Sequence, residues 1–279
     1  MKALIPAAGH GTRFLPASMT VPKEMLPVGA KPAIQLIVEE ALAAGADEVV
    51  VVTSPDKPSI RRHFDVDAVW HARCANKPEI ERELVRLEDI GRRIVWVEQT
   101  QQRGLGHAVL QAAGVLAGER EPVLVLLGDA LVSGEAPSAA MAAISRAYGG
   151  ASVVGLEEVP AEKVSRYGIV SGRRVDSSEA AVAGGVYRLD DLVEKPSPEE
   201  APSRLAIAGR YLLDPAVFSL LASQTPGHGG EIQLTDAIRR LLSDHAVYGY
   251  QYPGRRHDIG NPRGYFETLV AFDSAGGQT

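Results

Sequence analysis

Two short segments near the N-terminus carry residues suited to binding phosphate groups. An apolar run, residues 3–6, leads into the small-residue segment Ala7–Thr12, which Arg13 follows directly. Backbone N–H groups of such a loop can approach a polyphosphate closely, because Ala and Gly have no bulky side chain. A guanidinium offers phosphate a rigid fork of donors. A second cation, Lys23, lies between the prolines of Pro22–Pro27. Together the two segments predict a site for a nucleoside triphosphate.

Two familiar phosphate loops do not match this segment. A P-loop needs Gly-Lys-Ser/Thr after its first Gly and four further residues, and no Lys follows Gly11. The dinucleotide fingerprint needs a third small residue where this chain has Phe14. A dinucleotide-dependent oxidoreductase is therefore disfavoured.

The remaining pattern, Gly-x-Gly-Thr-Arg followed by Pro-Lys-Glu-Met-Leu-Pro, resembles the signature of the sugar-1-phosphate nucleotidylyltransferases. The resemblance covers residues 1–272 and is weakest over about 66–93. It implies that the chain transfers a uridylyl group from UTP to glucose 1-phosphate, with Mg²⁺, giving UDP-glucose and pyrophosphate. It also implies a homodimer or homotetramer. The alternatives are the same chemistry with dTTP or GTP and another sugar or cyclitol phosphate, and a catalytically silent regulatory or binding homologue.

Two aspartates are candidate metal ligands. Asp129 follows the apolar run Val-Leu-Val-Leu-Leu-Gly, so it should lie at the carboxyl end of a buried strand, where ligands of open α/β sheets gather. Mg²⁺ usually takes one or two carboxylates together with phosphate oxygens. The resemblance implies that Asp258 completes this site. Helix capping is the alternative role for each. Some members carry a second acid where this chain has Ala130.

The resemblance also implies roles for residues along the whole chain. Arg13, Lys23 and Lys195 would be the catalytic cations, holding pyrophosphate, the α-phosphate and the sugar phosphate respectively. The implied nucleotide-binding residues are Ala7, Ala8, Gly9, Gly11, Thr12, Glu24, Gln99 and Gly104, where Gln99 reads the base. The implied sugar-binding residues are Gly168, Glu194 and Gly209, bordered by the segment Gly229–Asp236.

The elements that must position these residues alternate between strand and helix. Apolar periodicity predicts strands at 3–6, 48–53, 93–98, 123–127, 151–156, 168–175, 185–195, 205–213 and 247–252. It predicts helices from Pro32 to Gly45 and at 59–64, 79–87, 106–117, 136–148, 215–222, 235–242 and 262–272. This order predicts an α/β fold with a Rossmann-like, mixed, mainly parallel sheet flanked by helices and a β extension on the sugar side.

The same pattern predicts one domain over residues 1–272. Residues 1–158 would form the nucleotide-binding half, and residues 159–272 the sugar-binding half with a C-terminal cap. Residues 273–279 would be a tail, expected to be disordered.

Composition sets further bounds. The net charge of −6 argues against binding nucleic acid through general electrostatics. The one cysteine, Cys74, can form no internal disulfide. The chain has no apolar run of about 18 residues and no leader-like N-terminus, which argues against a membrane span and favours the cytoplasm.

Overall fold

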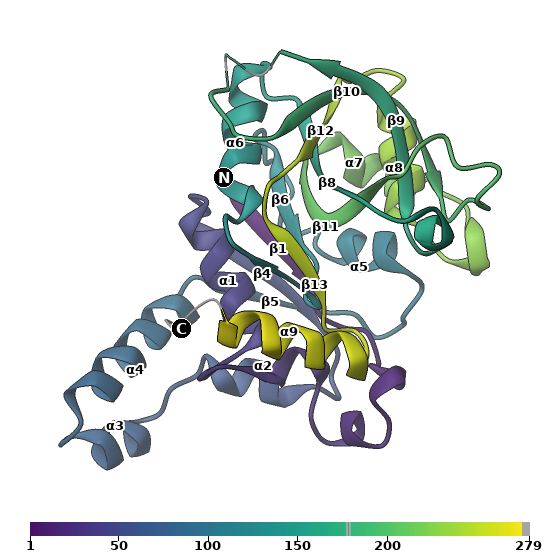
Figure 1. The fold of residues 1–279 in the computed structure, drawn as a ribbon. Helices are drawn as coiled ribbons and strands as arrows, with labels where there is room; N and C mark the ends of the chain where they lie inside the picture. The colour runs from purple at the N-terminus through teal and green to yellow at the C-terminus, as the bar shows by residue number, and fades with distance from the viewer. Residues whose placement is uncertain (177, 179, 275–279) are drawn as a thin grey trace.

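In the computed structural model, which describes residues 1–176, 178 and 180–274, the fold is built on a nine-stranded mixed sheet (Figure 1). The strands are, in sheet order, β5 (Ile94–Glu98), β4 (Glu48–Thr53), β1 (Lys2–Pro6), β6 (Val123–Leu126), β11 (Leu205–Leu213), β8 (Ser152–Glu158), β12 (Val247–Gln251), β10 (Gly185–Glu194) and β9 (Gly168–Val175). The first four strands are parallel, whereas β11 and β10 run antiparallel to their neighbours. The predicted mixed α/β fold is confirmed.

The other elements surround this sheet. Two small antiparallel pairs join β2 (Pro27–Val28) to β3 (Lys31–Pro32), and β7 (Ala130–Ser133) to β13 (Arg255–Asp258). The α-helices are α1 (Ala33–Ala43), α2 (Pro58–His63), α3 (Ala68–Cys74), α4 (Pro78–Gly91), α5 (Leu105–Gln111), α6 (Pro137–Ala147), α7 (Ala216–Ala222), α8 (Leu234–Leu241) and α9 (Pro262–Ser274). Short 3₁₀ turns occupy Thr12–Phe14, Ala17–Met19, Lys23–Met25, Ala161–Arg166 and His228–Gly230.

Strand residues alternate between two hydrophobic layers. In β4, Val49 and Val51 pack into the layer beneath α1 and α6, while Val50 and Val52 pack beneath α5, α7 and α8. The run Glu-Val-Val-Val-Val-Thr is apolar almost throughout because both of its faces are covered, as expected for an internal parallel strand. Figure 1 shows the two groups of helices on opposite sides of the sheet.

The two predicted halves share one sheet. Strand β11, from the C-terminal half, lies between β6 and β8 of the N-terminal half. Parallel pairing joins β5, β4, β1 and β6, and antiparallel pairing predominates on the sugar side. The carboxyl ends of β1, β4, β5 and β6 therefore meet at one edge of the sheet.

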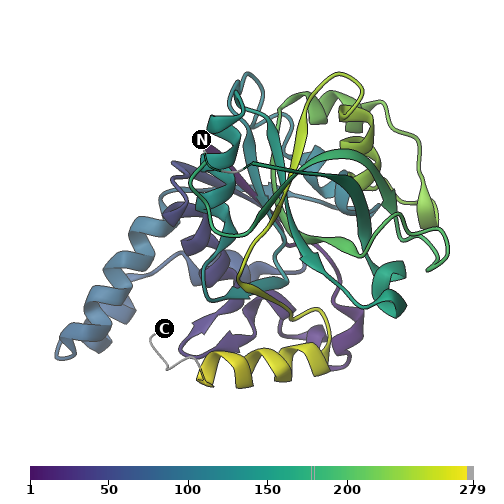
Figure 2. The same cartoon turned by 45° about the horizontal axis from the view of Figure 1, so that its top comes forward.

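Residues 66–93 form a helical hairpin, α3 and α4, that projects from the body of the molecule (Figure 2). Asp67 caps α3 by accepting hydrogen bonds from the backbone N–H groups of Val69 and Trp70. His71 joins the two helices, because its ring nitrogens contact carboxylates of Glu81 and Glu88 at 2.6 and 3.0 Å. Helix α4 was predicted from its periodicity, whereas α3 was not.

Several elements differ from those predicted. Helix α5 ends at Gln111 and not at 117, since the residues after it form turns. No strand was predicted at Arg255–Asp258, but this segment is strand β13. Helix α9 runs through Ser274, so the first two residues of the predicted tail are helical. Residues 275–279 of that tail, and the disorder expected there, lie outside the described residues.

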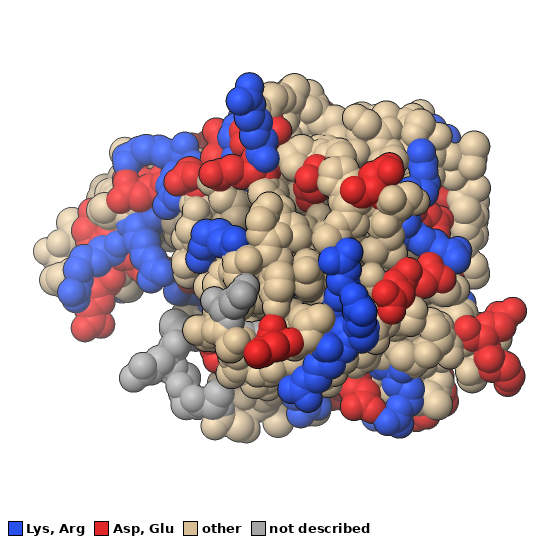
Figure 3. All heavy atoms as spheres, turned by 90° about the horizontal axis from the view of Figure 1, so that it is seen from above, with Lys and Arg blue, Asp and Glu red and all other residues tan. Residues whose placement is uncertain are grey.

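The surface carries both signs of charge. Figure 3 shows acidic and basic side chains interspersed over the face seen from above, apart from one short basic band. Within the described residues, no helix is long and apolar enough to cross a membrane.

Candidate active site

The loop after β1 is anchored from several sides at the carboxyl edge of the sheet. The Ala7 N–H donates to the Val52 carbonyl at the end of β4, and Ala7 and Ala8 are buried. The Gly128 N–H donates to the Pro6 carbonyl, and a β-carbon at Gly128 would lie only 2.8 Å from that oxygen. A close approach that only glycine permits thus places the end of β6 beside the loop.

A buried ion pair between Lys57 and Glu24 contacts the same loop. Lys57 Nζ donates to the Ala7 carbonyl at 2.9 Å and to both carboxylate oxygens of Glu24 at 2.9 and 3.1 Å. Glu24 is 1% exposed and Lys57 5%. Burial raises the pKa of the Glu24 carboxyl, and the nearby Lys57 and Lys23 oppose that shift. Glu24 was predicted to bind nucleotide; in the structure both oxygens of its carboxylate accept hydrogen bonds from Lys57 next to the loop.

Lys23 and Asp129 face each other across the site. Lys23 Nζ lies 2.5 Å from Asp129 Oδ2. Burial alone would raise the pKa of Asp129, but the ammonium of Lys23, with Arg13 nearby, holds that pKa below its usual value. The carboxylate is therefore charged at neutral pH, as metal binding requires.

Strand pairing brings Asp129 and Asp258 together from positions far apart in the chain. In the β7–β13 ladder, Ala130 pairs with Asp258, and the Ile259 N–H donates to the Asp129 carbonyl at 2.9 Å. Asn261 accepts a hydrogen bond from the Gly264 N–H at the start of α9, so Asn261 is the residue that caps this helix. The capping role considered for Asp258 is thus filled by a neighbour.

Both carboxylates and the guanidinium of Arg13 surround one point. A β-carbon at Gly260 would lie 2.7 Å from Asp258 Oδ1, 3.2 Å from Asp129 Oδ2 and 3.1 Å from Arg13 Nη2. Among the described residues, no group of three or more His, Cys, Asp or Glu side chains could hold a metal. Two converging carboxylates suit a hard divalent cation that takes its remaining ligands from phosphate and water.

The segment expected to read the base lies beside this edge. Gln99 follows β5, is 3% exposed, and donates its backbone N–H to the Thr53 carbonyl. Gly104 has φ +102°, and a β-carbon there would lie 2.8 Å from the Ile232 carbonyl oxygen. The Gly106 N–H donates to that same oxygen. The segment Gly229–Asp236 therefore packs against the Gly104 loop as well as against Gly168.

The residues predicted for the sugar side lie on β9, β10 and β11, except Lys195, which directly follows β10. Lys195 has φ +47°, an uncommon conformation for a residue with a side chain, and its Nζ lies 3.4 Å from Glu194 Oε1. A β-carbon at Gly168 would lie 2.8 Å from Thr235 Oγ1. Gly209 has φ +75°, and Arg210 beside it is fully buried.

Arg210 links strand β11 to strand β7 and helix α1. Its guanidinium donates to the Gly209 carbonyl, to the Ala130 carbonyl and to both carboxylate oxygens of Glu40. Sequence reasoning missed Arg210 and Lys57. Lys57 does stand four residues after a predicted buried strand, at the edge where ligands gather, which is a signal that could have singled it out.

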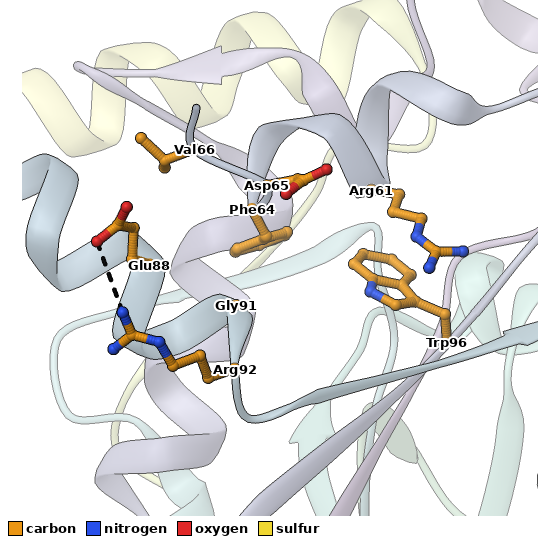
Figure 4. Close-up of a pocket in the computed structure, with 8 residues that line it drawn as sticks. All are labelled: Arg61, Phe64, Asp65, Val66, Glu88, Gly91, Arg92 and Trp96. Atoms are coloured by element: carbon orange, nitrogen blue, oxygen red, sulfur yellow. Dashed lines mark ion pairs between the residues drawn. The ribbon is translucent and has the colours of Figure 1, made fainter. Parts of the chain in front are cut away.

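A cavity of about 340 Å³ lies elsewhere, at the base of the α3–α4 hairpin (Figure 4). In Figure 4, Arg61 lies beside Trp96, and Arg92 pairs with Glu88. None of the residues predicted for the active site lines this cavity.

Comparison with known proteins shows the family of this chain. Residues 2–274 match the nucleotidyl transferase family. The chain belongs to that family. It is 42% identical over 272 residues to the UTP–glucose-1-phosphate uridylyltransferase of Staphylococcus epidermidis, covering 97% of this chain and 91% of that protein. It is 43% identical over 270 residues to UTP–glucose-1-phosphate uridylyltransferase YngB of Bacillus subtilis, covering 95% and 87%.

Solved structures resemble this nucleotidyl transferase along its whole length. A UDP-glucose pyrophosphorylase complexed with UDP-glucose superposes with a TM-score of 0.85 at 39% identity, covering 98% of each chain. A UTP-bound enzyme from Acinetobacter baumannii gives a TM-score of 0.85 at 34% identity, covering 99% of this chain and 94% of that one. The predicted family is confirmed.

Proposed function

We propose that this nucleotidyl transferase moves a uridylyl group from UTP to glucose 1-phosphate, releasing pyrophosphate and UDP-glucose. The observation that carries the proposal is the convergence of Arg13, Lys23, Asp129 and Asp258 on one edge of the sheet. The similarity to uridylyltransferases over nearly the whole chain supports this choice of substrates.

The reaction needs no covalent enzyme intermediate. An ionised oxygen of glucose 1-phosphate attacks the α-phosphorus of UTP, a new P–O bond forms, and the bond to the bridging oxygen of the β-phosphate breaks. The attacking oxygen is already charged at neutral pH, because the second pKa of a phosphate monoester is about 6. Catalysis then depends on alignment and on neutralising charge.

Each cation of the chain has a separate task in this proposal. Arg13 holds the departing pyrophosphate, Lys23 the α-phosphate and Lys195 the incoming sugar phosphate. Lys23 is paired with Asp129 in the structure, so binding of substrate requires the ammonium to exchange a carboxylate for a phosphate. Asp129 and Asp258 would hold Mg²⁺, which when bound neutralises phosphate charge.

The remaining predicted contacts complete the two substrate pockets. We assign the loop of Ala7, Ala8, Gly9, Gly11 and Thr12 to the triphosphate, and Gln99 with Gly104 to the base. Glu194, with Gly168 and Gly209, is assigned to the hexose. Glu24 is reassigned from nucleotide contact to support of the loop, because both of its oxygens accept from Lys57.

Pyrophosphate release from a matrix of nucleotides and sugar phosphates tests the proposal. We expect the highest kcat/KM with UTP and glucose 1-phosphate, and loss of turnover with EDTA that added Mg²⁺ restores. A preference for dTTP or GTP, or for another sugar or cyclitol phosphate, would be consistent with the proposed chemistry but would refute the proposed substrates. Absence of turnover with every pair would indicate a silent homologue.

Two further expectations belong to the same proposal. UTP and sugar phosphates are cytoplasmic metabolites, so we propose that the enzyme works in the cytoplasm. We also propose a homodimer or homotetramer, following the resemblance, and sedimentation of the purified protein measures its mass directly.

A further inference from the structure

One histidine beside the base pocket has a contact that the proposed reaction does not use. His107, on α5, is partly buried between two glutamine side chains. Its Nδ1 lies 2.7 Å from the amide nitrogen of Gln99, and its Nε2 lies 3.2 Å from the terminal amide of Gln111. Gln99 is the residue assigned to the base, so His107 directly contacts the side chain proposed to read the base.

The imidazole can hold the Gln99 amide in one orientation. Burial and the nearby charge of Arg103 lower the pKa of His107, so the ring is neutral at pH 7. A neutral imidazole has one acceptor and one N–H donor. With Nδ1 accepting from Gln99 Nε2, the proton is on Nε2. The Gln101 backbone carbonyl, which accepts a hydrogen bond from the ring, is the partner for that proton.

The opposite end of the Gln99 amide stays available to a ligand. Oε1 makes no hydrogen bond to any other described residue, and it is not among the buried side-chain atoms that lack a partner. It therefore retains exposure to the outside even though Gln99 as a whole is 3% exposed. The contact with His107 thus directs an N–H donor of Gln99 toward the imidazole and leaves the acceptor Oε1 accessible to a ligand.

We propose that His107 is a positioning residue for base selection, holding Gln99 so that Oε1 accepts a hydrogen bond from the N3–H of uracil. The inference deepens the proposed function and rests on it. Uracil presents a donor at position 3 and a carbonyl beside it, which match Oε1 and the second N–H of Nε2. Cytosine presents an acceptor at position 3 and an amino group at position 4. It needs the reversed amide, whose oxygen would face the lone pair of Nδ1.

The measured quantity is the ratio of kcat/KM for UTP to kcat/KM for CTP. Removing the acceptor in His107→Leu frees the Gln99 amide to turn, and we expect the ratio to fall by about 10- to 100-fold. The change should lie in KM more than in kcat, because Gln99 contacts the base and not the reacting phosphates. Thymine also has an N3–H, so discrimination between UTP and dTTP should not change.

A conservative variant and a matched control separate positioning from general damage. His107→Asn returns an amide oxygen near the place of Nδ1, and most of the ratio should return. His63→Leu breaks another His–Gln contact, the 2.9 Å contact between His63 Nε2 and Gln35 Oε1 on α1, and should leave the ratio unchanged. If His107→Leu does not fold, His107→Phe removes the same acceptor while keeping a ring of similar size, with the same expected fall in the ratio.

The outcomes distinguish this inference from the proposed function. A wild-type protein that turns over no UTP refutes the proposed function. A wild-type protein that prefers UTP, together with folded His107→Leu and His107→Asn variants of unchanged ratio, refutes the positioning role alone. Equal losses with UTP and CTP would also refute it, since a merely structural defect affects both nucleotides alike.

Discussion

The buried pair of Lys57 and Glu24 should be one of the most costly contacts to break in this protein. Both side chains lie almost wholly out of water, and the ammonium also binds the Ala7 carbonyl. In Lys57→Met the Glu24 carboxylate remains buried without its partner, which costs about 3–5 kcal/mol. The unpaired carbonyl adds about 1–3 kcal/mol. We therefore expect the free energy of unfolding at pH 8 to fall by at least about 3 kcal/mol.

The loss should depend on pH in a defined direction. Without Lys57, the pKa of Glu24, which burial already raises, rises further. The folded state then binds a proton more tightly than the unfolded state, so stability decreases as pH rises. The deficit of Lys57→Met relative to wild type should therefore be smaller at pH 5 than at pH 8.

Urea unfolding followed by circular dichroism measures both effects. Lys2→Met is the control, because the Lys2–Glu48 pair is much more exposed, at 28% and 34%, and should contribute at most about 1 kcal/mol. The double variant Lys57→Met/Glu24→Leu removes both charges and should recover most of the stability. A deficit below about 1 kcal/mol in Lys57→Met, or one that does not change between pH 5 and 8, would refute this reasoning.

Three further predictions concern the site and the hairpin. Asp129→Ala and Lys195→Ala should each lower kcat by at least about 10²–10³-fold in a folded protein, and near-normal turnover in either would remove its assigned role. Gly104→Ala should have a lower melting temperature than the control Gly118→Ala. Both glycines have positive φ, but only at Gly104 would the new β-carbon lie 2.8 Å from a backbone oxygen. Equal melting temperatures would contradict this close contact. Hydrogen bonds to two glutamates raise the pKa of His71, so its stabilisation of the hairpin is complete below the unfolded pKa of about 6.5 and is lost as pH rises through the folded value. Hydrogen-exchange protection of α3 should accordingly fall with rising pH in wild type and should depend less on pH in His71→Leu. The same pH dependence in both proteins would mean that the contact contributes nothing.

Local patterns predicted the elements that carry the site. The buried run before Asp129 predicted strand β6, and the apolar run before the small residues of the first loop predicted strand β1. These inferences work because strand periodicity and loop composition are properties of neighbouring residues. The resemblance extended them to Asp258, Gln99 and Lys195, whose neighbours alone do not distinguish them from surface or capping residues.

Contacts between distant segments were beyond such patterns. The register that pairs Ala130 with Asp258 depends on how β13 returns to β7, and Lys57 meets Glu24 only after β4 and the first loop are packed together. The amino-acid order therefore determined which residues stand at the ends of strands and in tight loops, since these depend on local conformational preference. Only the tertiary structure decided which of them meet and which charges are buried, because pairing and burial depend on packing between elements far apart in the chain.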